Sequence, residues 1–524
     1  MKNFRFLSLT LLALLGAVLL VACAAGTGTA GSSGNGTGGN EQPAVYTLSV
    51  EGARTEFAHL EPFSADGLTV YRAGGEENDG TPIALSADEY RVSAEGYNAN
   101  RAGVYTVTVE DLSGLAEAVT YEVKVLPADS LRLLIIGNSF GDDAMAHLYD
   151  AARSVGIPEE SICLANLFIG GCSLATHLSH MQSGAAAYEF HIFGEGGSAT
   201  VTNYTLDMGL AYTEWDFVML QQVSQDSGKS ETYAPLDTLL PYVREKAPSA
   251  RLAFHMTWAY QQNSTHGGFP AYGSNQMNMY DCIVTAVAEN VLTRDFDVLV
   301  PSGTAIQNAR TSYLGDTLTR DGYHLTLNYG RYTAALTVLG ALTGVDPTDV
   351  SYAPIGLWGD HISVCRESAY NALANDWWQV TPSAYTEEPT FDLSGYTKLE
   401  IDFTVGKYWH SMAAGAHNIL NGSGEFGMKF AATKRFTPEE LPVGAVIFIA
   451  EGWQARPEAW KDDALQTSRP DGLGAGYILV DETFFDGYIY RAFNISRSDG
   501  SSLADYADVL DEVFCIYIPA EDTE

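Results

Sequence analysis

Residues 131–148 read LRLLIIGNSFGDDAMAHL and decide the fold of the central part of the chain. The apolar run 131–136 predicts a strand that is buried on both faces of a parallel sheet. A turn around Ser139 ends the run, and a helical pattern follows, with Asp142 and Asp143 where the helix dipole favours negative charge. A strand, a tight turn and a helix in this order place the serine hydroxyl at the carboxyl end of a sheet, beside backbone N–H groups.

The serine of this stretch has two interpretations. A hydroxyl at a strand end is a candidate nucleophile, whereas a serine before a helix often only caps it. The blocks that favour the first interpretation lie further along the chain.

Strand and helix patterns alternate over residues 130–376, and this alternation predicts an α/β domain with a parallel sheet. We expect further strands at residues 216–220, 251–256 and 297–300, and helices at residues 276–292 and 328–342. Open sheets of this kind bind their ligands at the carboxyl ends of the strands.

Four short blocks fall at such strand ends or just before a helix: Gly137–Phe140, Ile169–Ser173, Leu220–Ser224 and Arg320–Leu325. Their order resembles that of the SGNH (GDSL-like) hydrolases, and more closely an uncharacterised branch with Gly-Asn-Ser-Phe first and Asp-Gly-x-His last. The resemblance covers roughly residues 131–345. It implies a flavodoxin-like, three-layer α/β domain and an ester hydrolase.

The resemblance also implies roles for individual residues. Ser139 matches the nucleophile, His324 the general base and Asp321 the carboxylate that orients the base. A serine hydroxyl needs such a base because it is a poor nucleophile near neutral pH. The backbone N–H groups of Ser139 and Gly171 match two oxyanion donors. The same residues also have structural interpretations: a buried histidine, an aspartate that caps a turn, and a glycine required only by a turn.

The amide block departs from the family pattern, which has Gly-x-Asn-Asp after the strand. Here residues 221–226 read QQVSQD. Straight alignment places Gln225 at the family asparagine, whereas the closer branch uses the pair Gln221 and Gln222. We expect Gln222 to be the side-chain oxyanion donor, and we expect no metal or cofactor.

The amino end predicts export. Residues 1–23 combine Lys2 and Arg5 with an apolar run and end in Leu-Val-Ala-Cys, which resembles the lipobox of bacterial lipoproteins. The resemblance implies cleavage before Cys23 and a lipid on its thiol, hence attachment to a membrane. The alternative is an unprocessed N-terminal anchor. Residues 24–42, rich in Gly, Ser and Thr, predict a flexible linker.

Charge and cysteine content exclude several classes of protein. With 28 Lys and Arg against 65 Asp and Glu, the net charge of -37 argues against nucleic-acid binding. Six cysteines are scattered without CxxC spacing, so neither a zinc site nor a disulfide framework is indicated. Buried free thiols are expected, with a Cys163–Cys172 pair as the alternative.

Two β-rich segments flank the central domain. Residues 43–128 alternate in short strands, and Gly103–Val107 resembles the Gly-x-Tyr-x-Val strand of bacterial Ig-like domains. Residues 377–392 predict a linker, and residues 393–524 predict a C-terminal β-sandwich. Its aromatic residues either stack on sugars or fill the core: Tyr408, Trp409, Trp453, Trp460, Tyr488 and Tyr490.

Together these features predict a multidomain, lipid-anchored, extracytoplasmic serine esterase. An O-acetyl group on a carbohydrate polymer is the expected substrate, by analogy with family and architecture. Two other classes stay open: a catalytically inactive carbohydrate-binding or adhesion protein, and a structural cell-surface protein. The sequence leaves the oligomeric state undecided.

Overall fold

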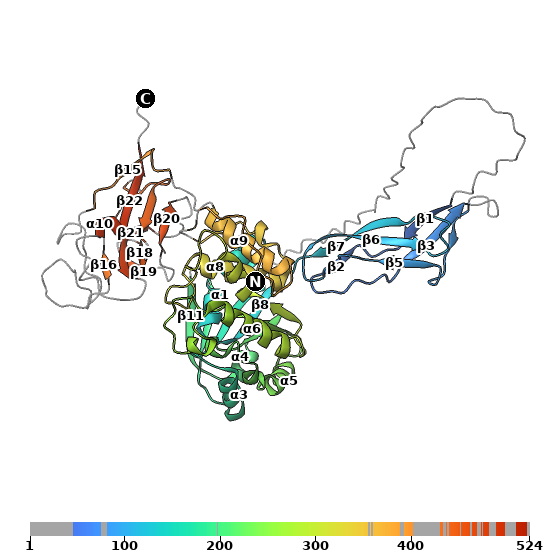
Figure 1. Cartoon of the computed structure of the whole chain (residues 1–524), viewed down its shortest axis with the longest axis horizontal. Helices are drawn as coiled ribbons and strands as arrows, with labels where there is room; N and C mark the ends of the chain where they lie inside the picture. Colours follow the sequence, from blue (N-terminus) through green and yellow to red (C-terminus); the bar gives the residue numbers. More distant parts are fainter. Residues whose placement is uncertain are drawn as a thin grey trace, which may run out of the picture.

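The chain forms three parts that follow one another along the sequence, with the α/β part between two β-sheet parts (Figure 1). The computed structural model describes residues 46–74, 81–195, 197–354, 357, 360–387 and 392–401, and residues 430–520 with several short gaps. The predicted signal segment, Cys23 and the linker 24–42 lie outside these residues. Within the described parts, no helix combines the length and hydropathy needed to cross a bilayer.

The N-terminal part consists of two small sheets. One has the order β1-β3-β4 and the other β2-β7-β6-β5, in which only the β2–β7 pair is parallel. The inward residues of β6 and β7 alternate, because successive side chains of a strand point to opposite faces, so Val107 and Val123 are buried. Its Ig-like family stays a prediction. The strands are β1 (Tyr46–Glu51), β2 (Glu56–Ala58), β3 (Thr69–Gly74), β4 (Ile83–Ala84), β5 (Tyr90–Ser93), β6 (Gly103–Asp111) and β7 (Val119–Leu126).

The central sheet has seven strands in the order β11-β10-β9-β8-β12-β13-β14. The run from β9 to β14 is parallel, as predicted, and β8 in its middle is almost wholly buried. The expectation of a wholly parallel sheet is wrong at one edge, where β10 and β11 form an antiparallel hairpin. The strands are β8 (Leu131–Gly137), β9 (Ile162–Phe168), β10 (Tyr188–Gly194), β11 (Gly197–Tyr204), β12 (Phe217–Gln221), β13 (Arg251–His255) and β14 (Val298–Val300).

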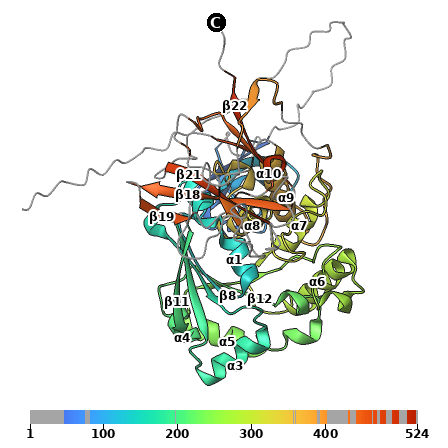
Figure 2. The ribbon, with the colours of Figure 1, turned by 90° about the vertical axis from the view of Figure 1, so that its left-hand side faces the viewer.

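Helices cover both faces of this sheet, as Figure 2 shows, which gives the three layers that were predicted. The helices α7, α8 and α9 pack together with α1 against one face, and α3 and α5 lie together on the other. Helix α8 is buried almost throughout, because other helices surround it. The helices are α1 (Ser139–Met145), α2 (Leu148–Ser154), α3 (Leu174–Ser183), α4 (Leu206–Leu210), α5 (Leu236–Lys246), α6 (Gln276–Asn290), α7 (Ser302–Ala309), α8 (Tyr329–Thr343) and α9 (Asp360–Ala374).

The N-terminal part contacts the α/β part at the carboxyl end of α8. The N–H of Ala102 donates to the carbonyl of Gly344 (2.8 Å), and the N–H of Ala128 donates to that of Thr343 (2.8 Å). Gly344 has a φ of +75°, and a Cβ there would lie 2.6 Å from the His59 ring. Glycine therefore allows both the turn and the close contact at this junction.

The C-terminal part has two four-stranded antiparallel sheets, with the orders β15-β22-β17-β20 and β16-β21-β18-β19. Trp453 is 3% exposed in the core between them. Tyr408, Trp409 and Tyr488 lie outside the described residues, as do the side chains of Trp460 and Tyr490. The elements are β15 (Tyr396–Lys398), β16 (Phe430–Ala432), β17 (Val446–Ile449), β18 (Trp453–Lys461), β19 (Ala464–Ser468), β20 (Gly476–Leu479), β21 (Ile489–Arg497), α10 (Leu510–Val513) and β22 (Phe514–Pro519).

Candidate active site

Ser139, His324 and Asp321 form one hydrogen-bonded chain. The Oγ of Ser139 lies 2.8 Å from Nε2 of His324, and Nδ1 of His324 lies 2.6 Å from Oδ2 of Asp321. Ser139 is the first residue of α1 and is separated from β8 only by Asn138, while the other two residues come from the loop before α8. The structure thus brings together residues that are 185 positions apart in the sequence.

The loop of His324 is shaped by Asp321. Its Oδ1 accepts hydrogen bonds from the backbone N–H groups of Tyr323 (3.2 Å) and His324 (2.8 Å). Partial burial favours a raised pKa for Asp321, but the bonds from the ring and backbone of His324 outweigh it and lower the pKa. The ionised carboxylate accepts the Nδ1 proton, so Nε2 is left to accept the serine proton.

Asn138 holds Ser139 and the glycine turn in place. It caps α1, because its Oδ1 accepts from the N–H of Phe140 (3.0 Å), so the capping role considered for Ser139 belongs to its neighbour. Its Nδ2 donates to the carbonyl of Cys172 (3.1 Å), which fixes the turn that contains Gly171. Gly171 has a φ of +64°, a left-handed conformation that favours glycine.

The three glutamines of the amide block have different surroundings. Nε2 of Gln221 donates to Oδ1 of Asn138 (2.7 Å), and its Oε1 lies 3.0 Å from Nδ1 of His255. The amide nitrogen of Gln222 already has two partners, since Nε2 donates to Oγ1 (2.9 Å) and the carbonyl (3.0 Å) of Thr232. The expectation that Gln222 donates to the oxyanion therefore does not fit this geometry.

Gln225 is the glutamine whose side-chain amide makes no hydrogen bond within the described residues. It lies beside the turn at Gly268, where a Cβ would come within 2.4 Å of the Cβ of Gln225. That turn is close to the catalytic loop, because the ring of the neighbouring His266 packs 4.8 Å from that of Tyr323.

A buried ionic cluster joins the nucleophile helix to the base loop. Asp143, on α1, is 1% exposed. Its Oδ1 accepts from Nη1 of Arg320 (3.1 Å) and Nε of Arg331 (2.9 Å), and its Oδ2 accepts from the N–H of Leu325 (2.8 Å). Because Arg320 and Leu325 flank the loop of His324, Asp143 holds the base next to the serine. Sequence reasoning missed this role and used Asp143 only as a first-turn acid.

Aromatic rings pack against the nucleophile helix and the loop of His324. Phe140 stacks on Trp258 with their centroids 4.4 Å apart, and Nε1 of Trp258 donates to the carbonyl of Tyr323 (2.7 Å). Trp258 and Tyr260 are fully buried, so they belong to the core beside the site. The ring of Tyr323 is only partly buried and lies 4.2 Å from that of His324.

Other reactive side chains near the site are held neutral. Burial lowers the pKa of both His177 and His255 to about 3. Burial raises the pKa of the Cys172 thiol to about 12, although the residue follows Gly171 directly. Within the described residues all cysteines are free, so the Cys163–Cys172 pair does not form.

Fold and site together define an α/β protein with a Ser-His-Asp triad at the carboxyl end of its central strand. The chain belongs to the DUF4886 family. The model described as a domain of unknown function (DUF4886) matches residues 132–372. The crystal structure of a DUF4886 family protein from Bacteroides uniformis is 40% identical, and the match covers 48% of this chain and 97% of that chain with a TM-score of 0.46.

More distant solved structures are also similar. A predicted SGNH hydrolase from Slackia heliotrinireducens is 20% identical, over 41% of this chain and 99% of that chain, with a TM-score of 0.28. A two-domain esterase active on acetylated mannans is 10% identical, over 75% of this chain and 92% of that chain, with a TM-score of 0.23. Among curated proteins none matches the chain.

Proposed function

We propose that this protein is a serine esterase whose nucleophile is Ser139. The observation that carries the proposal is the continuous chain of hydrogen bonds, 2.8 Å from serine to histidine and 2.6 Å from histidine to aspartate. A structural histidine needs neither a serine hydroxyl on one nitrogen nor a carboxylate on the other. The same constellation on unrelated folds performs acyl transfer.

The geometry supports a two-step reaction. Nε2 of His324 takes the proton of Ser139 as Oγ attacks the ester carbonyl, and the resulting imidazolium is stabilised by Asp321. The imidazolium then protonates the leaving alcohol as the carbonyl–oxygen bond breaks, which leaves an acyl-serine. In the second step His324 takes a proton from water, which attacks the acyl group, and the proton returns to Oγ as the carboxylic acid leaves.

The tetrahedral intermediate needs donors that are already in place. The backbone N–H groups of Ser139 and Gly171 donate to no other group within the described residues, and Asn138 fixes both segments. For the third donor we assign Gln225 in place of Gln222. Nε2 of Gln222 donates to two oxygens of Thr232, and Nε2 of Gln221 donates to Asn138. The side-chain amide of Gln225 makes no hydrogen bond within the described residues.

The substrate class follows from the chain as a whole. The predicted export, the lipid on Cys23 and the long linker would hold the enzyme outside the cytoplasm, at a membrane. A tethered enzyme with two further β-sheet parts suits an extended polymer. We therefore infer that the ester is an O-acetyl or similar group on a carbohydrate, with no nucleic-acid partner.

Hydrolysis assays test the proposal. The chain without residues 1–23 should release 4-nitrophenol from 4-nitrophenyl acetate and acetate from acetylated xylan or acetylated mannan. Ser139→Ala should lower kcat by about 10³-fold or more, and Asp321→Asn by about 10³- to 10⁴-fold. Ser161→Ala is the matched control, because Ser161 lies at the amino end of its strand, just before β9, whereas Ser139 lies beyond the carboxyl end of β8. Equal rates for Ser139→Ala and the unchanged protein would refute the mechanism.

A further inference from the structure

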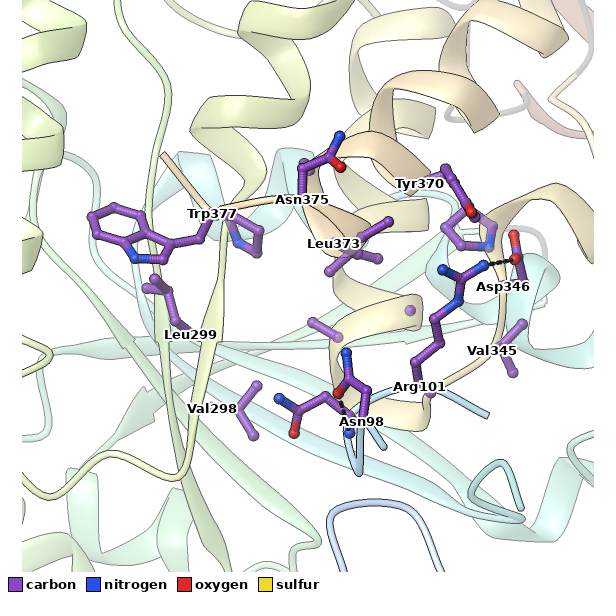
Figure 3. Close-up of a pocket in the computed structure, with 18 of the residues that line it drawn as sticks. Asn98, Arg101, Val298, Leu299, Val345, Asp346, Tyr370, Leu373, Asn375 and Trp377 are labelled. Atoms are coloured by element: carbon purple, nitrogen blue, oxygen red, sulfur yellow. Dashed lines mark hydrogen bonds and ion pairs between the residues drawn. The ribbon is translucent and has the colours of Figure 1, made fainter. Parts of the chain in front are cut away.

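A cleft with a volume of about 350 Å³ lies where the N-terminal part meets the α/β part (Figure 3). It is lined by the loop of Asn98 and Arg101, the start of β14, and the carboxyl ends of α8 and α9. Pockets for small molecules occupy about 300 to 1,000 Å³, so the volume suits a small ligand or part of a longer one.

This cleft is separate from the candidate active site. It lies along β14 and at the carboxyl end of α8, whereas the loop of His324 precedes the amino end of α8. The two sites therefore lie at opposite ends of the 15-residue helix α8, which at 1.5 Å per residue is about 22 Å long. A molecule in this cleft is therefore out of reach of Ser139.

Contacts across the junction fix the walls of the cleft. Nη2 of Arg101 lies 2.9 Å from Oδ2 of Asp346, and the guanidinium lies 4.5 Å from the centre of the Tyr370 ring. The two backbone hydrogen bonds of Ala102 and Ala128 hold the same interface. The cleft is thus preformed, and a ligand would not have to order it.

The lining combines an apolar wall with amide groups. Figure 3 shows Trp377 and Leu299 on one side, Leu373 between, and Arg101 with Tyr370 and Asp346 on the other. Asn98, Asn100 and Asn375 add side-chain amides. Amides donate and accept hydrogen bonds at once, as neighbouring hydroxyl groups of a sugar require, while an indole and leucines suit the C–H face of a pyranose ring.

The charges of the lining favour an uncharged ligand. Arg101 is paired with Asp346, and Asp297 lies 3.4 Å from a nitrogen of Arg244. The remaining charged residue of the lining, Asp376, is exposed to water. With one arginine against three carboxylates, the cleft repels anions such as phosphates and uronates.

We propose that this cleft is a non-catalytic binding site for a segment of neutral oligosaccharide. A polymer held here stays near the enzyme while its ester groups reach Ser139 near the other end of α8. The identity of this glycan with the proposed substrate rests on the proposed function, but binding itself does not.

Calorimetric titration tests the site. Ser139→Ala in the chain without residues 1–23 is titrated with unacetylated mannohexaose, xylohexaose and cellohexaose. We expect at least one of them to bind with a dissociation constant of about 1 mM or lower. Trp377→Ala should raise that constant about tenfold or more, which is a loss of about 1.4 kcal/mol. Trp378→Ala is the control, because this neighbour is 49% exposed and lies outside the cleft lining.

A second variant protects the test against misfolding. Asn98→Ala with Asn100→Ala removes two side-chain amides of the loop before Arg101, together with the bond from the N–H of Asn100 to Oδ1 of Asn98 (2.9 Å). This variant should weaken binding while hydrolysis of 4-nitrophenyl acetate by the Ser139-containing chain stays unchanged. Absence of binding by all three oligosaccharides, or unchanged binding by the Asn98/Asn100 variant, would overturn the proposal. Binding without any ester hydrolysis would leave the cleft in place and refute the esterase.

Discussion

Replacing Asp143 by asparagine should shift the loop of His324 relative to Ser139 and so lower both stability and activity. The carboxylate is 1% exposed and uses one oxygen for Arg320 and Arg331 and the other for the N–H of Leu325. Asparagine has the same shape but only one acceptor oxygen. If that oxygen faces the arginines, its NH₂ group faces the N–H of Leu325, and in the other orientation it faces two guanidinium groups.

The loss in the free energy of unfolding can be estimated from values known for buried ion pairs. Removing one partner of a buried ion pair costs about 3 to 5 kcal/mol. The side chains of Arg320 and Arg331 are 25% and 17% exposed, so water compensates part of the loss. We therefore expect Asp143→Asn to lower the free energy of unfolding by about 3 kcal/mol, at the lower end of that range.

Activity should fall more than stability alone explains. The N–H of Arg320 donates to the carbonyl of His324 (2.9 Å), so a shift of Arg320 moves the base. A misplacement of about 1 Å costs on the order of 100-fold in rate, and the loss should appear in kcat and leave KM nearly unchanged.

The assay combines urea unfolding with hydrolysis of 4-nitrophenyl acetate at a temperature where circular dichroism shows the variant folded. Glu160→Gln, which neutralises one exposed carboxylate, is the control and should stay within about 0.5 kcal/mol. A loss of stability below about 1 kcal/mol together with an unchanged kcat would show that Asp143 does not hold the base loop.

Four further outcomes are expected. Gln225→Leu should lower kcat by about 10²- to 10³-fold if its amide binds the oxyanion, and an unchanged kcat would refute that assignment. Gly171→Ala should destabilise the protein by about 1 to 2 kcal/mol, because its φ is +64°. Cys172 should resist iodoacetamide at pH 8 in the folded protein, because burial raises its pKa to about 12, and mass spectrometry of the alkylated peptide checks this. Burial lowers the pKa of His59 to about 4, so the folded protein binds fewer protons at this residue than the unfolded chain does. The free energy of unfolding should therefore fall as the pH drops below about 6.5, by about 2 kcal/mol at pH 5. This loss should be absent in His59→Gln.

The parallel core of the sheet was predictable because local patterns determine it. Residues 131–136 form an uninterrupted apolar run, and this signals a strand with both faces covered. The hairpin of β10 and β11 lacks such a signal: β11 reads GSATVTNY and is mostly exposed, as an edge strand allows. Its direction depends on pairing with β10, which short-range periodicity does not encode.

The triad was predictable because Ser139 and His324 stand in recognisable blocks, but its supports were not. Asp143 has no local feature that distinguishes it from Asp142, which accepts from Asn166 and contacts His191 instead. What separates the two is the arginines of a loop and a helix that lie about 180 residues away, and only the folded chain brings them to α1.

In the glutamine block, too, tertiary contacts determine which role each side chain takes. Gln221 and Gln222 are chemically identical neighbours, yet successive residues at a strand end point to opposite sides, so one amide meets Asn138 and the other Thr232. Gln221 thus positions Asn138, and Gln222, whose Oε1 accepts from the N–H of Leu174 (3.1 Å), positions the segment that follows Gly171. Gln225, three residues further on, keeps its amide uncommitted, and it is the residue that straight alignment places at the family asparagine. If Gln225→Leu lowers kcat as proposed, position after the strand will be a better guide to the oxyanion donor of this block than the local Gln-Gln pair.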